Sequence, residues 1–338
     1  MGGEDHQAAG DGAHATAAAA VDSAAALSKA WCNAEHCLPL DDVVRREVWE
    51  GSIPIRLELA SQDVSTFEPP MPFYLQAPRM AYLPMALAAA KTYFANYVPS
   101  VSCTEREMWA EYKNIPLRWH LPTGVLYDLF AHGDELPWGL TLHFSGVEAK
   151  GLLPYENEST IKRHFRQALK EATCLRYGSC KRVNNLSKAQ MEQLWTALSE
   201  NKFDSFAPIN AELLRMSQAG PAGLAEIKRL PVRVMLPHLQ SPIQHPMLPY
   251  KDDGSLLTLG EALSLVLPAL FPKDKVDDDV GESRGNGSDD DRPLVIVQGI
   301  EAPLSTPALW LCQQLASADT MLYISVRPAV SGSNADTS

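Results

Sequence analysis

The sequence predicts an α+β protein in which two units of strands and helices, residues 44–150 and 228–328, flank a helix-rich unit at residues 151–227. Three observations support this organisation. Apolar and polar residues alternate in short runs in both outer units, which is typical of half-buried strands. Apolar residues recur at helical spacing in the middle unit. The outer units also share an order of elements, although they share no repeated sequence.

In the first unit, the stretch WEGSIPIRLEL alternates apolar and polar residues and predicts a strand. FYLQAPR predicts a second strand, and MALAAAKTYFANYV predicts a helix with one apolar face. MWAEYKNIPLRWHLP then predicts two short strands around a Lys-Asn turn, and LTLHF predicts the strand that closes the unit.

Two helices are predicted in the middle unit, over residues 159–175 and 187–198, and a third short helix over residues 208–216. Ser187 is the expected N-cap of the second helix, with Gln190 completing a capping box. The first helix has an apolar stripe, formed by Ile161, Phe165, Leu169 and Ala172.

The second outer unit begins with LPVRVML, a predicted strand, and PIQHPMLP is its expected hairpin partner. TLGEALSLVLPALF predicts an amphipathic helix with Thr258 as N-cap and Glu261 in a capping box. A buried strand at Leu294–Val297, a turn and the strand MLYISVRP follow. This is the element order of the β-grasp, the fold of ubiquitin, and VIVQGIEAPLSTPALWL…MLYISVR also resembles ubiquitin's third strand, turn and last strand. We therefore expect both outer units to be ubiquitin-like.

The net charge is concentrated in two segments of low complexity. The 338-residue chain carries −12 at pH 7, but residues 1–42 hold seven acids against one base, and residues 273–292 hold eight acids against four bases. We expect disordered tails at 1–43 and 329–338, and an acidic disordered insert at 273–292. The acidity therefore says little about what the folded part binds.

Several features favour a cytoplasmic protein. The N-terminal segment is rich in Ala and Gly and lacks the basic and strongly apolar parts of a secretory signal. No run of 18 apolar residues predicts a membrane span. The six cysteines form no C-x-x-C pair, which is typical of proteins in a reducing compartment.

The sequence lacks the common motifs of cofactor and metal sites. It contains no glycine-rich nucleotide loop, no H-E-x-x-H and no G-x-S-x-G, and its histidines do not cluster with cysteines at zinc spacing. We therefore expect no metal and no cofactor. His120 and His143 lie beside strand residues and are expected to be structural.

The segment 161–182 is basic, with seven Lys or Arg residues and one acid, Glu171. On a helical wheel Lys170 lies about 140° from Phe165, so it is expected to face solvent, with Glu171 on the opposite flank. Three interpretations stay open: a solvated face, attraction to anionic lipid or nucleic acid, and a site of lysine modification. The residues expected to form a basic face for membrane or partner contact are Arg163, Arg166, Lys181 and Arg182.

A thiol enzyme that acts on ubiquitin-like adducts is a further hypothesis. Cys174 and Cys180 have basic neighbours, which lower the pKa of a thiol. His164 is the nearest histidine in sequence, but ten residues of helix separate it from Cys174 by about 15 Å.

PLRWHLPTGVLYDLF, followed by LPWGLTLHF, resembles the autophagy protein 5 family, whose members carry P-L-[KR]-W-H-x-P-x-G-x-L-x-D-L and then L-P-W-x-[IL]-T-[VL]-H-F. VWEGSIPIRLEL, YLQAPRMAYLP, QLWTALSENKFDSFAPINAEL and TLGEAL are also similar to that family, in the same order over residues 44–328. The resemblance implies two ubiquitin-like domains flanking a helix-rich domain.

The resemblance also implies a non-catalytic scaffold, joined through one lysine to the C-terminal glycine of the ubiquitin-like autophagy protein 12. In the family this lysine lies in the first long helix of the middle domain, just before Glu-Ala. The matching residue here is Lys170 in ALKEAT, with Lys162 and Lys181 as neighbouring candidates. E1-like and E2-like enzymes would carry the thioester chemistry.

Further partners follow from the same resemblance. A helix of autophagy protein 16 is expected to dock in a groove among the three domains. The assembly is expected to act like an E3 ligase in the lipidation of autophagy protein 8 on phosphatidylethanolamine. The expected location is cytoplasmic and peripheral at the phagophore assembly site and isolation membrane, with no nucleic-acid partner.

Overall fold

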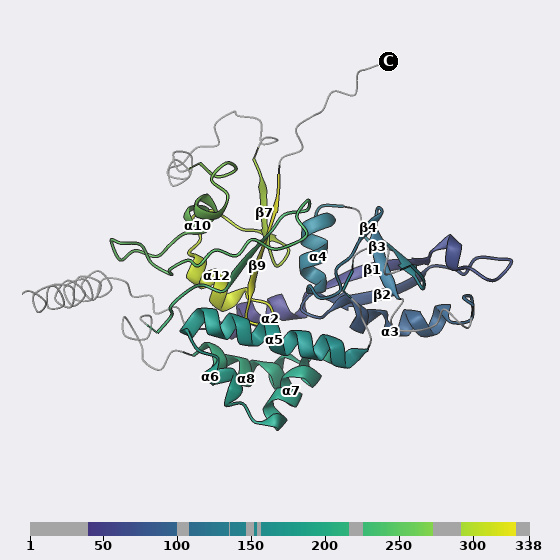
Figure 1. Ribbon diagram of the computed structural model, residues 1–338, viewed down its shortest axis with the longest axis horizontal. Helices are drawn as coiled ribbons and strands as arrows, with labels where there is room; N and C mark the ends of the chain where they lie inside the picture. Colours follow the sequence, from purple (N-terminus) through teal and green to yellow (C-terminus); the bar gives the residue numbers. More distant parts are fainter. Residues whose placement is uncertain are drawn as a thin grey trace, which may run out of the picture.

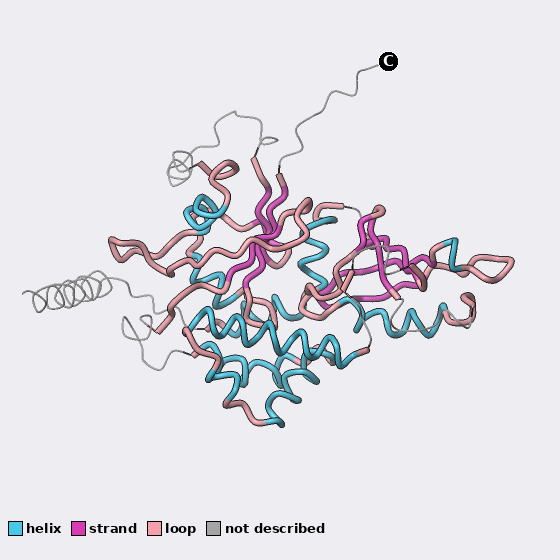
Figure 2. The backbone as a smooth tube through the Cα atoms, viewed as in Figure 1, coloured by secondary structure: helices cyan, strands magenta, loops and turns pink. Residues whose placement is uncertain are grey.

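The computed structural model describes residues 40–99, 108–134, 136–146, 152–153, 157–215, 226–272 and 292–328. In this part of the chain, two sheet-containing units lie side by side above a layer of helices (Figure 1). The strands are confined to these two units, and helices make up the lower layer (Figure 2). The predicted tails, as far as residue 39 and from residue 329, and the predicted acidic insert, as far as residue 291, lie outside the described residues.

The first unit contains a five-stranded sheet. Its first and last strands pair in parallel at the centre, and the outer pairs are antiparallel. The order β2-β1-β5-β3-β4 and the helix α3 (Leu83–Phe94) beside it confirm the predicted ubiquitin-like fold. The strands are β1 (Ser52–Leu59), β2 (Phe73–Pro78), β3 (Trp109–Tyr112), β4 (Ile115–Pro116) and β5 (Trp138–His143).

Local patterns in this unit form as predicted. Ile53, Ile55 and Leu57 point into the core, because alternate residues of a strand face the same side of a sheet. The hairpin between β3 and β4 turns at Lys113 and Asn114, whose φ angles are 47° and 66°. Positive φ at both central residues is the geometry of a tight two-residue hairpin.

Three α-helices of the described residues were not predicted, and the shortest of them, at Lys181–Asn184, belongs to the middle unit. The helix α2 (Asp42–Glu50) begins two residues before the expected domain boundary, with the Asp41 side chain accepting hydrogen bonds from two backbone N–H groups of its first turn. The helix α4 (Thr123–Phe130) is buried over its first seven residues, so its sequence carries no amphipathic period. Packing determines α4, whereas α2 also has a local signal, the Asp41 N-cap.

The middle unit is a bundle of helices, and its first long helix spans the layer (Figure 1). The predicted capping box of Ser187 and Gln190 is formed. The last helix begins at Phe203, five residues earlier than predicted, and contains Pro208 in its interior, because Phe203 and Phe206 extend its buried face. The helices are α5 (Glu158–Tyr177), α6 (Lys181–Asn184), α7 (Lys188–Ser199) and α8 (Phe203–Leu214).

The second unit repeats the ubiquitin-like arrangement with a four-stranded sheet in the order β6-β9-β7-β8. The capping box of Thr258 and Glu261 is formed, as predicted. PIQHPMLP contributes only isolated bridges, such as Val234 to Ile243, because its prolines lack the N–H groups that a ladder needs. The elements are β6 (Val232–Met235), α10 (Leu259–Val266), β7 (Leu294–Val297), β8 (Ile300–Glu301), α12 (Ala308–Gln314) and β9 (Leu322–Arg327).

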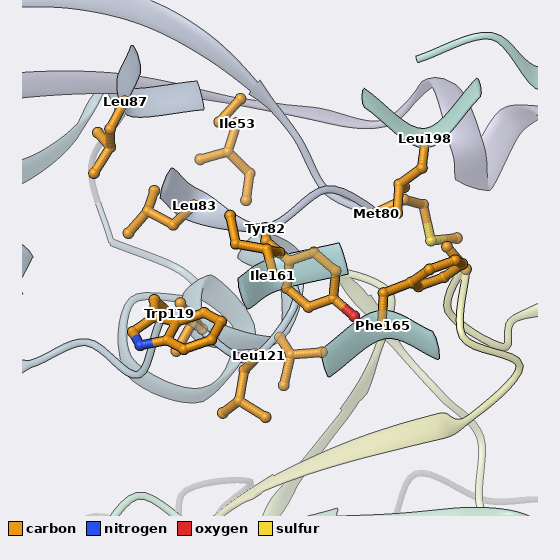
Figure 3. Close-up of a cluster of buried hydrophobic side chains, with 14 of the residues drawn as sticks. Ile53, Met80, Tyr82, Leu83, Leu87, Trp119, Leu121, Ile161, Phe165 and Leu198 are labelled. Carbon is orange, nitrogen blue, oxygen red and sulfur yellow. The ribbon is translucent and has the colours of Figure 1, made fainter. Parts of the chain in front are cut away.

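The first unit and the helical layer share one hydrophobic core. Ile161 and Phe165 of α5 lie among Met80, Tyr82 and Trp119 of the first unit (Figure 3). The second unit has a core of its own and also adds Met235, Met321 and Tyr323 to the shared core. The helix α5 is therefore packed mainly on the first unit, with the second unit at the edge of the same core. Within the described segments, no helix is both long and apolar enough to cross a membrane.

Candidate functional site

The helix α5 carries the candidate site and is capped at both ends. The Asn157 side chain accepts the N–H of Ser159 at 3.0 Å. At the other end Gly178 has φ 69°, and its N–H donates to the carbonyl oxygen of Cys174 at 2.8 Å. This left-handed residue ends the helix and turns the chain back. The whole predicted apolar stripe of α5 is buried, as expected.

Lys170 is half-buried, whereas the helical wheel predicted a solvent-facing side chain. The chain after Gly178 returns to the backbone of this turn of α5. There the Cys180 thiol donates to the Lys170 carbonyl oxygen at 3.6 Å. Among the described residues, no hydrogen bond or ion pair holds the Lys170 ammonium group. The Lys170 side chain is therefore partly buried, and its amine is uncommitted, which here means that it forms no hydrogen bond or ion pair with a described residue.

The neighbouring lysines differ from Lys170 in their contacts. The Lys162 ammonium forms an ion pair with Glu192 of α7, and its side chain is 26% exposed. Lys181 is exposed, and no described side chain pairs with its ammonium group. Lys162 is therefore the most constrained of the three candidate amines.

The residues of the predicted basic face differ in their exposure and in their contacts. Arg163, Arg166 and Lys181 are exposed. Arg182 is half-buried, pairs with Glu226 at 3.0 Å, and stacks its guanidinium 3.8 Å from the centre of the Tyr177 ring. Arg182 therefore joins parts of the protein rather than offering a free charge.

Glu171 points away from this face and links α5 to the second outer unit. Its carboxylate accepts from Arg233 Nη2 at 2.8 Å and from Gln244 Nε2 at 2.9 Å. Burial acts to raise the pKa of Glu171, but these two hydrogen bonds hold that pKa below its usual value. The residue next to Lys170 thus anchors the helix, which fixes the direction in which Lys170 points.

The two cysteines lie close together, but His164 is elsewhere. Burial, followed by the neighbouring Cys174 thiol, raises the pKa of Cys180. The ring of His164 packs 5.4 Å from His120 and 5.9 Å from Trp119, and burial lowers its pKa. Because a raised pKa favours the protonated thiol and His164 packs against other rings, Cys180 is poorly suited to act as a catalytic nucleophile.

The residues that join the two outer units were not predicted from the sequence. Arg79 and Asp128 form a buried ion pair in the first unit, with the nearest atoms 2.5 Å apart. Asp128 also accepts the backbone N–H of Gly299 in the second unit. Asp128 lies inside the quoted PLRWHLPTGVLYDLF motif, but nothing in a one-dimensional pattern indicates a partner so far along the chain.

The described segments contain no group of three or more His, Cys, Asp or Glu side chains that could hold a metal ion.

Family models match three consecutive parts of the chain. They are described as autophagy protein ATG5, UblA domain, at residues 48–144, the alpha-helical bundle region at 158–216, and the UblB domain at 229–326. These matches follow the three units of the fold.

Individual proteins give the same result. Autophagy protein 5 of Arabidopsis thaliana is 31% identical over 325 residues, which cover 82% of this chain and 96% of the relative. Autophagy protein 5 of Aspergillus clavatus is 29% identical, with 84% of this chain and 96% of the relative covered. The crystal structure of Kluyveromyces marxianus Atg5 superimposes with a TM-score of 0.64 at 24% identity, covering 85% of this chain and all of the other.

Proposed function

Because the chain belongs to the autophagy protein 5 family, we propose that it is a non-catalytic scaffold that accepts autophagy protein 12 on Lys170. This assignment rests on the contrast between the two lysine amines of α5. The ammonium of Lys170 is uncommitted among the described residues, whereas that of Lys162 is paired with Glu192.

The chemistry requires little from this chain beyond the amine. The neutral Lys170 nitrogen attacks the thioester carbonyl that joins autophagy protein 12 to an E2-like enzyme. The C–N bond forms, the C–S bond breaks, and the enzyme's thiol leaves while the amine loses its proton. The conjugating enzymes supply the activated carbonyl, so this chain contributes the position of the nucleophile.

The rigid setting of α5 supports a scaffold role. The helix is packed on the first unit through Phe165 and tied to the second through Glu171 and Arg233. A protein attached at Lys170 would therefore be held at a fixed place on the helical layer. We assign to the resulting conjugate, with autophagy protein 16 bound through its helix, the E3-like stimulation of autophagy protein 8 lipidation on phosphatidylethanolamine.

The proposed location is cytoplasmic and peripheral at the phagophore assembly site and isolation membrane. Exposed Arg163, Arg166 and Lys181 supply cations that anionic lipid headgroups attract. The thiol-enzyme hypothesis gains no support, since the raised pKa of Cys180 favours the unreactive thiol and His164 packs against other rings.

The test is co-expression of this chain with the E1-like and E2-like enzymes and autophagy protein 12, followed by a denaturing gel. Lys170→Arg is compared with Lys162→Arg and Lys181→Arg, which keep the charge at each position. We expect a covalent product in the wild type and in both control variants, and none in Lys170→Arg. The same product in all four lanes would exclude Lys170 as the acceptor.

A further inference from the structure

The end of α5 brings two cysteines to one place. Gly178, in the left-handed conformation, reverses the chain after Tyr177, and Cys180 returns to the helix. Its sulfur lies 3.6 Å from the carbonyl oxygen of Lys170. Cys174 is one helical turn after Lys170, and helical side chains tilt toward the N-terminus, which directs its sulfur toward that same carbonyl.

The two sulfurs are therefore neighbours. The Cys174 thiol is close enough to Cys180 to contribute, after burial, to raising the pKa of the Cys180 thiol. Their exposure differs, since Cys174 is exposed and Cys180 is half-buried. An accessible thiol therefore lies beside a second, less exposed thiol that can react with its sulfenic acid.

We propose that Cys174 and Cys180 form a reversible disulfide when the protein meets a hydroperoxide. The sulfur of Cys174 attacks the peroxide, so that an S–O bond forms, the O–O bond breaks, and an alcohol or water leaves. The sulfur of Cys180 then attacks the resulting sulfenic acid, so that the S–S bond forms and water leaves. The two thiols lose two electrons and two protons in total, and the hydroperoxide is reduced by the same two electrons.

Oxidation changes the contacts next to Lys170. The Cys180 sulfur loses its proton and can no longer donate to the Lys170 carbonyl oxygen. The bond also fastens the returning segment to the last turns of α5. A small-molecule thiol reverses the reaction by thiol–disulfide exchange, because Cys174 is accessible from solvent.

Cys312 provides an internal comparison within the same chain. It is fully buried, and burial raises the pKa of its thiol to about 12. A peroxide should leave it reduced in the folded protein.

Trypsin separates the two cysteines, which makes the bond directly visible. Cleavage after Lys170, Arg176 and Lys181 yields EATCLR and YGSCK, each with one cysteine. The reduced full-length chain is treated with hydrogen peroxide, alkylated, digested without reductant and analysed by mass spectrometry. We expect these two peptides as a linked pair, lighter by two hydrogens than their sum, and its loss after treatment with dithiothreitol.

Variants test separately the role of Cys174, which attacks the peroxide, and the role of Cys180, which attacks the sulfenic acid. In Cys180→Ser, a sulfenic acid that dimedone traps should accumulate at Cys174, without the linked pair. Lys170→Arg should form the pair as the wild type does, so the result is independent of conjugation. The proposal is wrong if peroxide leaves Cys174 and Cys180 alkylated to the same extent as Cys312. It is also wrong if Cys174 proceeds to sulfinic acid without linkage, or if the pair forms equally well in urea-unfolded chain.

Discussion

The carboxylate of Asp128 in the first ubiquitin-like unit accepts the backbone N–H of Gly299 in the second, with the two atoms 2.9 Å apart. The same carboxylate forms an ion pair with Arg79, and both of its oxygens accept hydrogen bonds from Arg79 Nη2. Gly299 has φ 79°, and a Cβ added there would lie 2.9 Å from Cζ of Arg79. One buried carboxylate therefore connects a cation of its own unit with a tight turn of the other.

Replacing Asp128 with Asn should strongly destabilise the protein. The substitution leaves the Arg79 charge buried without a counter-charge, which typically costs about 3–5 kcal/mol. The measurement is the free energy of unfolding in urea at pH 7. Asp204→Asn is a suitable control, because it removes the pairing of Arg46 with an 81% exposed side chain, and its midpoint should stay close to that of the wild type. Equal midpoints for the two variants would contradict the role given to Asp128.

Gly299→Ala should destabilise more than Gly133→Ala. Both glycines have positive φ, at 79° and 82°, so both substitutions carry the conformational cost of about 1–2 kcal/mol. A Cβ at Gly133 meets nothing within 4 Å, whereas one at Gly299 meets the guanidinium that Asp128 holds in place. The difference in thermal stability between the two variants measures the steric cost at Gly299, because both variants carry the same conformational cost. A loss no greater at Gly299 than at Gly133 would show that Arg79 moves aside freely.

The protein should lose stability as the pH falls below 6.5, in part through His120. Burial, assisted by the nearby charges of His164, Arg118 and Arg233, lowers the pKa of His120 from 6.5 to about 4. Between pH 6.5 and about pH 4, the unfolded chain binds a proton at His120 that the folded chain does not. The free energy of unfolding therefore decreases as the pH falls through this range. The full effect of this residue by pH 4 is about 3 kcal/mol.

The variant His120→Gln removes this titration and provides the comparison. Unfolding of both proteins between pH 7 and pH 5 should show a shallower decline in the variant. Parallel declines would mean that His120 is protonated in the folded state well above pH 4.

Charge reversal at Arg163 and Arg166 should weaken binding to anionic vesicles. Both side chains are exposed, and each basic residue near an anionic surface contributes about 1 kcal/mol. Sedimentation with phosphatidylserine vesicles should show a loss of affinity of about 30-fold or more for Arg163→Glu with Arg166→Glu. Neutral phosphatidylcholine vesicles serve as the control. Unchanged binding to the anionic vesicles would remove these arginines from membrane contact.

The ion pair of Lys162 with Glu192 should restrict conjugation at Lys162. Lys170→Arg alone should give no conjugate. In that background Glu192→Gln frees the Lys162 amine, and we expect a minor product at Lys162 to appear. Peptide mapping of the conjugate band identifies the modified lysine. A product that stays at Lys181 whether or not Glu192 is present would show that the ion pair does not control the choice.

Much of the fold could be predicted because its signals are local. The alternation in β1 and the apolar stripe of α5 follow from the geometry of a strand and a helix. The capping boxes at Ser187 and Thr258 depend on hydrogen bonds between residues three positions apart. Such patterns are complete within a few residues, so the sequence by itself determined them and, through the shared order of elements, the two ubiquitin-like units.

Only the tertiary structure decided the features that depend on distant partners. The helix α2 packs on the helical layer through Trp49, whose ring centre lies 4.4 Å from that of Phe206. The helical wheel placed Lys170 in solvent, whereas the tertiary structure leaves it half-buried. Asp128 and Gly299 meet across 171 positions of sequence. Packing of whole units determines contacts at such separations, and neither propensity nor periodicity carries that information.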